Sequence, residues 1–241
     1  MGSTRFLTGC AWAVHFYTAL GAVAGLLALN YIAHDDWRDA FSMMAIAVAI
    51  DASDGPMARA LRVRERIPYF DGAMLDNIVD YFTYVAVPVF LMLRAQLLPD
   101  NATGEVIAGF VMVASGYGFS RTDAKTEDHY FLGFPSYWNL VAFYLFCLGF
   151  TPAVNAAIVA ILALMAFVPI KYIYPNRTEL MRPLTLTLAA IWAVATVAML
   201  PMLPRHNDIL LYTSLGFVVY YFVMSFALYA HPARIAARRA L

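Results

Sequence analysis

Long apolar runs, separated by short polar stretches, divide the chain into eight segments. An α-helix needs about 20 mostly apolar residues to cross the hydrocarbon core of a bilayer, and most of these runs approach that length. The eight predicted spans cover residues 10–33, 40–60, 73–96, 104–121, 136–150, 153–173, 183–201 and 208–230. The pattern therefore predicts an all-α, polytopic membrane bundle in which residues 1–241 form a single domain.

The composition supports a membrane protein. Hydrophobic residues make up 62% of the 241 residues and charged residues 13%, whereas a soluble domain has about 45–50% and about 25%. The 16 basic and 16 acidic residues balance, so the chain has no general attraction for nucleic acid. A soluble globular domain and a disordered chain are both excluded.

Basic residues are distributed unevenly between the alternate loops of the predicted bundle. With the N-terminus inside, only Arg38, Arg94 and Arg205 fall on the outer side, and the remaining 13 of the 16 Lys and Arg residues fall on the inner side. Cytoplasmic loops of membrane proteins are rich in Lys and Arg. We therefore expect both termini to face the cytoplasm.

Four aspartates interrupt the second and third apolar segments. Asp51 and Asp54 follow the apolar run 43–50, and Asp76 and Asp80 open the next run. A charge inside a spanning helix costs about 2.5–3.5 kcal/mol on insertion scales, so four of them need a reason. A buried ion-pair network is the structural alternative, but one arginine on the same helix face, Arg59, cannot balance four aspartates.

Helical periodicity places these aspartates on two stripes that can face each other. At about 100° per residue, the residues sharing one face are Asp51, Asp54, Gly55, Ala58 and Arg59 on the second helix, and Gly72, Asp76 and Asp80 on the third. A basic loop joins the two helices, so we expect both stripes near the inner surface of the membrane. The small residues let a ligand or a neighbouring helix come close.

Aspartates gathered in one crevice favour a divalent cation. The carboxylates repel one another unless a cation neutralises them, and an all-oxygen set suits a hard ion such as Mg²⁺ or Mn²⁺. Two ions can share bridging carboxylates, and Arg59 adds a donor suited to phosphate. These residues predict a site for a phosphorylated, lipid-linked substrate.

The pattern Asp51-x2-Asp54-Gly55-x2-Ala58-Arg59, followed by Gly72-x3-Asp76-x3-Asp80, resembles the signature of the CDP-alcohol phosphotransferases. Arg59 and Gly72 are further apart here than is usual in that family. This longer spacing, together with segments 15–21 and 133–144, resembles the bacterial phosphatidylcholine synthase branch. The resemblance covers essentially the whole chain.

The resemblance implies a reaction and a role for each motif position. Enzymes of the family transfer a phosphatidyl or similar group from a CDP-linked donor to an alcohol and release CMP. In the branch that this chain resembles, the donor is CDP-diacylglycerol and the acceptor is free choline. The implied roles are metal ligand for Asp51, Asp54, Asp76 and Asp80, general base for Asp80, and contact with the CDP diphosphate for Gly55, Ala58, Arg59 and Gly72. The implied cofactor is two ions of Mn²⁺ or Mg²⁺, and the implied setting is the inner membrane of a bacterium, with a cytoplasmic active site and a possible homodimer.

Further candidates lie outside the signature. Choline carries a quaternary ammonium that aromatic rings hold well, so Tyr84, Tyr137 and Trp138 are predicted to bind it, with ordinary packing as the alternative. Arg121 and Lys125 end the fourth helix and are predicted to contact lipid or phosphate. Flanking charge of the usual cytoplasmic kind is the alternative for these two.

Two rival functions fit part of the pattern. The first keeps the reaction and changes the acceptor to serine, inositol phosphate or glycerol phosphate, of which the anionic acceptors would require extra basic residues in the pocket. The second is an ion-coupled transporter, because acids within the membrane also mark ion pathways. The chain has no convincing internal repeat of the kind common in transporters, which argues against the second.

Overall fold

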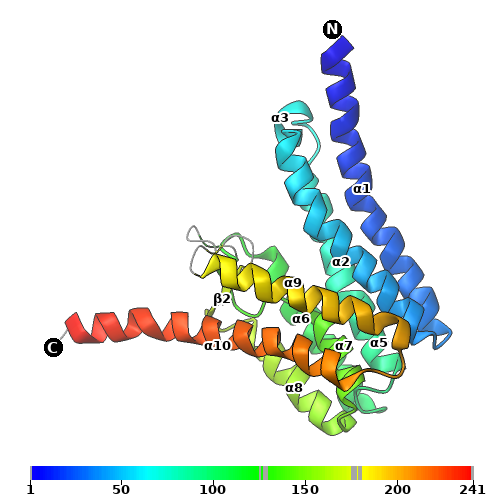
Figure 1. The fold of residues 1–241 in the computed structure, drawn as a ribbon, viewed down its shortest axis with the longest axis vertical. Helices are drawn as coiled ribbons and strands as arrows, with labels where there is room; N and C mark the ends of the chain where they lie inside the picture. The colour runs from blue at the N-terminus through cyan, green and yellow to red at the C-terminus, as the bar shows by residue number, and fades with distance from the viewer. Residues whose placement is uncertain (1, 125, 127–129, 175–177, 179–180, 240–241) are drawn as a thin grey trace.

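The computed structural model describes residues 2–124, 126, 130–174, 178 and 181–239. It is a bundle of helices with one short two-stranded sheet among the described residues, which confirms the predicted fold class (Figure 1). The helices are α1 (Gly2–Ala33), α2 (Trp37–Ala60), α3 (Val63–Arg66), α4 (Gly72–Asp80), α5 (Val87–Arg94), α6 (Ala102–Ser120), α7 (Trp138–Leu148), α8 (Pro152–Met165), α9 (Arg182–Met199) and α10 (Asp208–Arg239). The π-helical segment η1 (Tyr81–Ala86) joins α4 to α5, and the 3-10 turn η2 (Leu200–Met202) follows α9.

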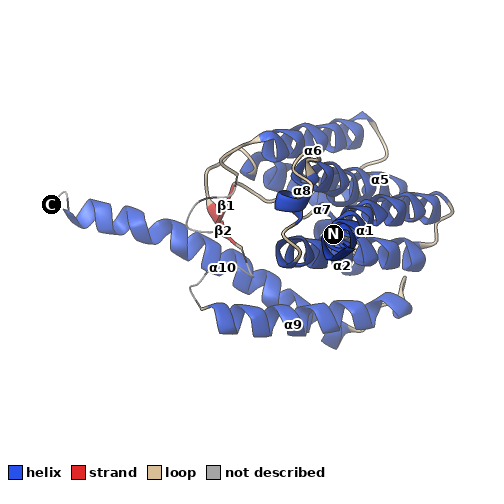
Figure 2. Cartoon of the chain, turned by 90° about the horizontal axis from the view of Figure 1, so that it is seen from above, coloured by secondary structure: helices blue, strands red, loops and turns tan. Residues whose placement is uncertain are grey.

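The bundle has two visible parts (Figure 1). The first half of α1, the second half of α2 and α3 stand out together, and we call them the arm. The other helices form the body, in which α9 and α10 lie side by side as one layer against the remaining helices (Figure 2). The two parts are continuous because α1 and α2 run from the arm into the body.

Each predicted apolar segment corresponds to a helix or to a continuous helical run. By length and hydropathy, five described runs suit a membrane span: Arg5–Ala33, Gly72–Arg94, Ala102–Ser120, Arg182–Met202 and Asp208–Ala227. The helices α7 and α8 are apolar but shorter, and α2 carries two of the aspartates. The number of eight spans and their orientation stay predictions.

The sixth predicted helix is wrong at its C-terminal end. The helix α8 ends at Met165, and residues Lys171–Ile173 form strand β2 instead. This strand pairs antiparallel with β1 (Tyr130–Leu132). The cause is Pro169, which has no N–H for a helix and biases the residue before it towards an extended conformation.

Each of the two parts has its own apolar cluster. The larger one lies in the body, where Leu91, Met92 and Trp138 are almost fully buried between α5 and α7 and their neighbours. The smaller one joins α1 to α3 in the arm and contains Val14 and Ile67. Many large apolar side chains on the outer surface are exposed, as expected of helices that face lipid, since acyl chains are as apolar as leucine.

A close approach between α1 and the third helical run positions the aspartates. A Cβ atom added at Gly25 would lie 2.6 Å from Cε1 of Phe82 and 3.1 Å from Cγ2 of Thr83, so the absence of a side chain allows α1 to contact η1. The helices α2 and α4 both pack against α1 as well. Helix α1 therefore acts as the common support for the two helices that carry the acidic motif.

Candidate metal and substrate site

Three of the four motif aspartates meet in the structure. Asp51 of α2 and Asp76 and Asp80 of α4 each contribute one carboxylate oxygen to a group in which these atoms lie within 4.8 Å of one another. Asp76 and Asp80 lie on the same side of α4 because residues four apart in a helix share a face. The prediction that the two stripes face each other is thus confirmed for these three residues.

The geometry of the three carboxylates fits a divalent cation. All three side chains are partly buried, and three negative groups this close repel one another unless a positive charge lies among them. Carboxylate oxygens that converge in this way are the ligands that Mg²⁺, Mn²⁺ and Ca²⁺ take in proteins. The residues that could hold a metal are therefore Asp51, Asp76 and Asp80.

Asp54 lies apart from this group. Its side chain is 5% exposed on the face of α2 towards α1. Thr18 of α1 and Arg59 both lie close enough to act on its carboxylate, and the Thr18 hydroxyl donates to the carbonyl of Val14 at 3.2 Å. In the structure Asp54 lies between α2 and α1, and its role as a fourth metal ligand stays a prediction.

The aromatic residue Tyr84 is hydrogen-bonded to one aspartate of the acidic group. Its hydroxyl donates a hydrogen bond of 2.6 Å to Oδ2 of Asp51. Tyr84 lies in η1, and a π-helical segment turns by fewer degrees per residue than an α-helix, so it shifts the side chains that follow. A hydrogen-bonded partner of this kind fixes the orientation of a metal-binding carboxylate.

Replacing Tyr84 with Phe tests this positioning role. The change removes the hydroxyl and keeps the ring, so we expect the Mn²⁺ concentration for half-maximal activity to rise about tenfold, as is typical when a partner of a ligand is lost. Tyr81→Phe is the matched control, because the hydroxyl of Tyr81 donates to the carbonyl of Met112 at 3.0 Å instead. An unchanged metal requirement in Tyr84→Phe would contradict the assignment.

The small residues of the motif make room for larger neighbours. At Gly55, an added Cβ atom would lie 3.3 Å from Nη1 of Arg59, so this guanidinium lies back along α2. At Gly72, an added Cβ atom would lie 3.0 Å from Nδ1 of His15, so the imidazole covers the first residue of α4. Ala58, one residue before Arg59, is partly buried. The sequence predicts that these positions let a ligand approach, and the structure adds His15 as a neighbour of Gly72.

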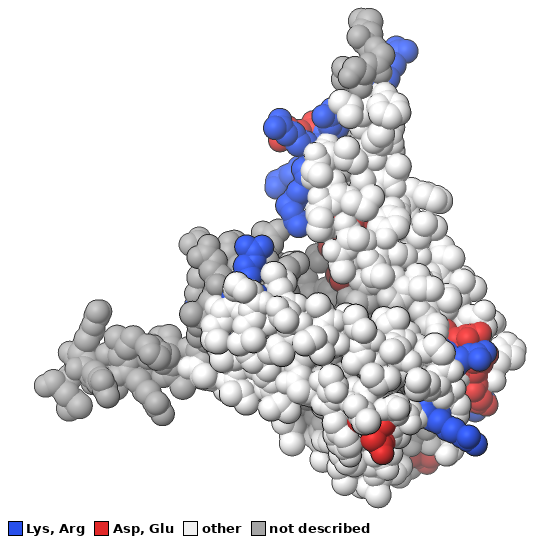
Figure 3. Space-filling view, viewed as in Figure 1, with Lys and Arg blue, Asp and Glu red and all other residues white. Residues whose placement is uncertain are grey.

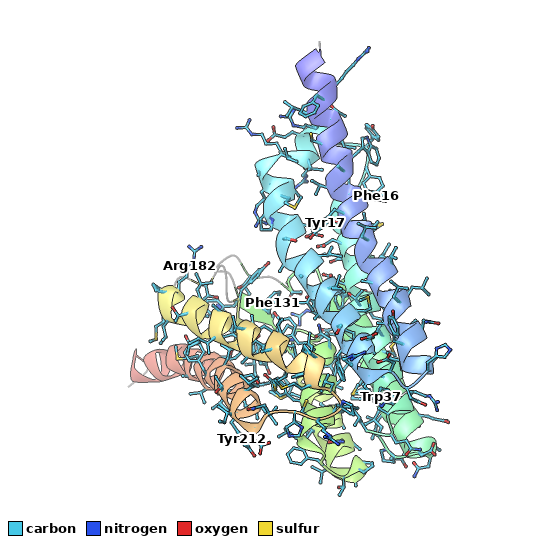
Figure 4. The ribbon with its side chains drawn as sticks, turned by 45° about the vertical axis from the view of Figure 1, so that its right-hand side comes forward. Phe16, Tyr17, Trp37, Phe131, Arg182 and Tyr212 are labelled. Carbon is cyan, nitrogen blue, oxygen red and sulfur yellow. The ribbon has the colours of Figure 1, made fainter. Side chains whose placement is uncertain are left out.

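The surroundings of the site combine both signs of charge. Figure 3 shows acidic side chains inside a hollow between the arm and the body, with basic side chains along the edge of the arm and at one end of the α9–α10 layer. The basic residues of these edges are Arg59, Arg62, Arg64 and Arg66 at the end of α2 and around α3, and Arg182 at the start of α9 (Figure 4). Such a hollow attracts a ligand that carries phosphate groups and a divalent cation together.

The predicted choline residues are placed differently from one another. The ring of Tyr137 lies 6.3 Å from that of Tyr84, centre to centre, and so belongs to the site. Trp138 is fully buried, its indole N–H donates to Oγ of Ser115 at 2.8 Å, and its ring packs edge-on against Phe134. Tyr137 is the N-cap of α7 and Trp138 its first residue, so the chain turns into the helix between them and the two side chains face different sides. The position of Trp138 does not favour contact with choline.

Of the two predicted phosphate contacts, Arg121 is described, and it follows the last residue of α6 as its C-cap. Arg121 pairs with Asp123 through two hydrogen bonds of 2.8 Å, and this guanidinium holds the pKa of the exposed Asp123 carboxyl below its usual value. A phosphate at Arg121 would have to compete with Asp123. Lys125 lies outside the described residues.

Two further rings adjoin the site, and neither is among the choline residues predicted from the sequence. Phe131 of β1 lies 6.5 Å from Tyr137 between ring centres, and Tyr174, which follows β2, lies 4.5 Å from Phe131. The signal in the sequence is the alternating run Lys171-Tyr172-Ile173-Tyr174, which is typical of a strand with one aromatic face. The predicted span 153–173 treats residues 171–173 as helix, whereas they form β2.

Comparison with known proteins agrees with the geometry of the site. No family model matches the sequence. The chain is 37% identical to a phosphatidylcholine synthase of Legionella pneumophila subsp. pneumophila, over 90% of this chain and 87% of the relative. It is 39% identical to one of Legionella bozemanae, over 85% and 97%, and 35% identical to one of Pseudomonas aeruginosa, over 83% and 84%. These similarities confirm the resemblance expected from the aspartate motif, and the chain therefore belongs to the family of bacterial phosphatidylcholine synthases.

Proposed function

We propose that the protein is a phosphatidylcholine synthase that transfers the phosphatidyl group of CDP-diacylglycerol to free choline and releases CMP. The observation that carries the proposal is the group of Asp51, Asp76 and Asp80 in a partly basic hollow, with the aromatic rings of Tyr84 and Tyr137 beside it. A metal site suits the diphosphate of the donor, and aromatic rings suit the quaternary ammonium of the acceptor.

The acidic group is the proposed metal site. Asp51, Asp76 and Asp80 would hold Mn²⁺ or Mg²⁺, and two ions is the proposed number. Asp54 would join as the fourth ligand. When bound, the ions neutralise the diphosphate and stabilise the charge that develops on the leaving CMP.

The chain's own residues orient the reactants and move the proton. Arg59 would pair with a donor phosphate through its planar guanidinium. Gly55, Ala58 and Gly72 would leave room for the CDP group. Asp80 would take the proton of the choline hydroxyl, because a positioned carboxylate acts as a general base. The choline oxygen then displaces CMP at the phosphorus that carries diacylglycerol, so that one P–O bond forms and one breaks.

The proposed location follows from the two halves of the donor. The acyl chains of CDP-diacylglycerol stay in the bilayer and its nucleotide is soluble, so the site belongs at the membrane boundary. We place it at the cytoplasmic face of a bacterial inner membrane, with both termini inside and residues 1–241 as one domain. Arg121 and Lys125 are the proposed lipid contacts, and a homodimer is the proposed assembly.

The proposal can be tested in living cells by following the incorporation of labelled choline into lipid. The full chain would be expressed in a bacterium that makes no phosphatidylcholine, and the cells would be fed deuterated choline. We expect labelled phosphatidylcholine in the lipid extract, and none from cells that express Asp76→Asn. Wild-type protein that is folded in the membrane but gives no labelled lipid would contradict the proposal.

A further inference from the structure

The ladder β1–β2 carries aromatic side chains on one face. Phe131 pairs directly with Tyr172 in the antiparallel register, so the two side chains lie on the same face. Tyr174 comes two residues after Tyr172 and returns to that face, because side chains alternate along a strand. The ring centres of Phe131 and Tyr174 are 4.5 Å apart, which shows that the alternation holds beyond the last residue of β2.

This aromatic face continues to the acidic group without a gap. The ring centres of Phe131 and Tyr137 are 6.5 Å apart and their planes make an angle of 86°. The ring centres of Tyr137 and Tyr84 are 6.3 Å apart, with an angle of 50° between the planes. The hydroxyl of Tyr84 in turn donates its hydrogen bond to Asp51. Tyr137 lies within electrostatic reach of Asp51, Asp80 and Tyr174. The rings thus form a corner whose inner end touches the proposed metal site.

The rings of this corner differ in burial from Tyr172, which lies on the same face of the ladder. Tyr84, Tyr137, Phe131 and Tyr174 are all partly exposed. Tyr172 is fully buried and stacks on Tyr221, with ring centres 6.1 Å apart. The ladder lies against α10, which packs on β2 (Figure 2), and in Figure 4 Phe131 is seen in the region between α9 and the arm. Tyr172 therefore anchors this face of the ladder in the core, whereas the rings of the corner keep part of their surface accessible.

We infer that Phe131 and Tyr174, together with Tyr137, bind the trimethylammonium group of choline. The inference rests on the proposed function, which makes choline the acceptor. A quaternary ammonium has no N–H to donate, so ring faces within about 6 Å and nearby carboxylates are what hold it. Choline's hydroxyl is separated from its nitrogen by two carbons, so the hydroxyl can face Asp80 while the ammonium lies against the rings. The ladder is thus the part of the fold that selects the acceptor.

Substitution by leucine tests the inference, because leucine is apolar and has no ring face. In Phe131→Leu and Tyr174→Leu we expect the KM for choline to rise about tenfold, within the range for loss of a desolvated cation–π contact. The KM for CDP-diacylglycerol and kcat at saturating choline should stay unchanged. Phe131→Tyr and Tyr174→Phe keep the ring and should keep the wild-type KM. Phe110→Leu is the matched control, since the ring of Phe110 stacks on Phe167 at 6.1 Å, centre to centre.

A direct readout separates this inference from the proposed function. Tetramethylammonium has the methyl groups and charge of choline without its hydroxyl, so it should inhibit the wild type competitively with choline and inhibit both leucine variants more weakly. A leucine variant that fails to fold is replaced by Phe131→Met or Tyr174→Met, because methionine adapts to gaps in a core. Wild-type protein that makes phosphatidylcholine, with leucine or methionine variants of unchanged KM and inhibition, would overturn the inference alone. Wild-type protein that makes none would overturn the proposed function.

Discussion

Replacing Asp80 with Asn should lower the rate of phosphatidylcholine formation by at least about 10³-fold. Asparagine has nearly the same shape as aspartate, but it cannot accept the proton of the choline hydroxyl. General-base catalysis alone contributes about 10²–10⁴-fold, and the variant also removes one negative charge from the group of Asp51, Asp76 and Asp80. The measurement is the rate of CMP release by purified protein at saturating substrates.

Asp71→Asn is the matched control for this variant. Asp71 precedes α4, and its side chain accepts a hydrogen bond of 3.0 Å from the backbone N–H of Met74. Asparagine caps a helix about as well as aspartate, so this variant should keep the wild-type rate. A folded Asp80→Asn protein that works within about tenfold of the wild type would contradict the role of Asp80, because a general base contributes more than that.

Removing divalent cations should abolish the reaction completely, and adding Mn²⁺ or Mg²⁺ should restore it. The physical reason is that the converging carboxylates of Asp51, Asp76 and Asp80 repel the negatively charged diphosphate of the donor. Cations between the carboxylates and the diphosphate neutralise this repulsion. The cation should also stabilise the folded protein, since it binds the native carboxylate group and not the unfolded chain. At about 100 times Kd this linkage is worth about 2.7 kcal/mol, which is about 5–10 °C in Tm for a chain of this size.

Thermal unfolding in detergent with increasing Mn²⁺ measures the second effect independently of activity. The wild type should gain stability, and Asp76→Asn should gain little. In a chelator, Asp76→Asn should be at least as stable as the wild type, because the substitution relieves repulsion among the carboxylates. Equal stabilisation of both proteins by Mn²⁺ would place the cation elsewhere.

The helices and three of the aspartates could be predicted from the sequence because both depend on local periodicity. Apolar runs near the length of a bilayer crossing define the helices, and a spacing of four residues places Asp76 and Asp80 on one side of α4. The facing position of Asp51 followed from a short connection between two amphipathic stripes. The early end of α8 was also available from Pro169, whose effect on a helix is local.

The parts that could not be predicted depend on which partner a side chain meets. Periodicity placed Asp54 on the motif face, but only the packing of α1 shows that its carboxylate lies near Thr18 rather than in the group of the other three aspartates. Tyr137 and Trp138 are adjacent in the sequence, and the direction of α7 decides that one reaches the site and the other the core. The pairing of Phe131 with Tyr172 joins segments about 40 residues apart, and such register is set by tertiary contacts rather than by local pattern.

The central claim, a metal-dependent transfer of phosphatidyl to choline, is tested most directly by product stoichiometry. The purified full chain would be placed in liposomes with CDP-diacylglycerol and Mn²⁺, and choline, serine and glycerol 3-phosphate would be offered separately. Mass spectrometry would count lipid product and CMP in each. We predict phosphatidylcholine and CMP in equal amounts with choline, and neither with the other two acceptors or in a chelator. Folded protein that releases no CMP with any acceptor would contradict the account and would favour an ion-coupled transporter.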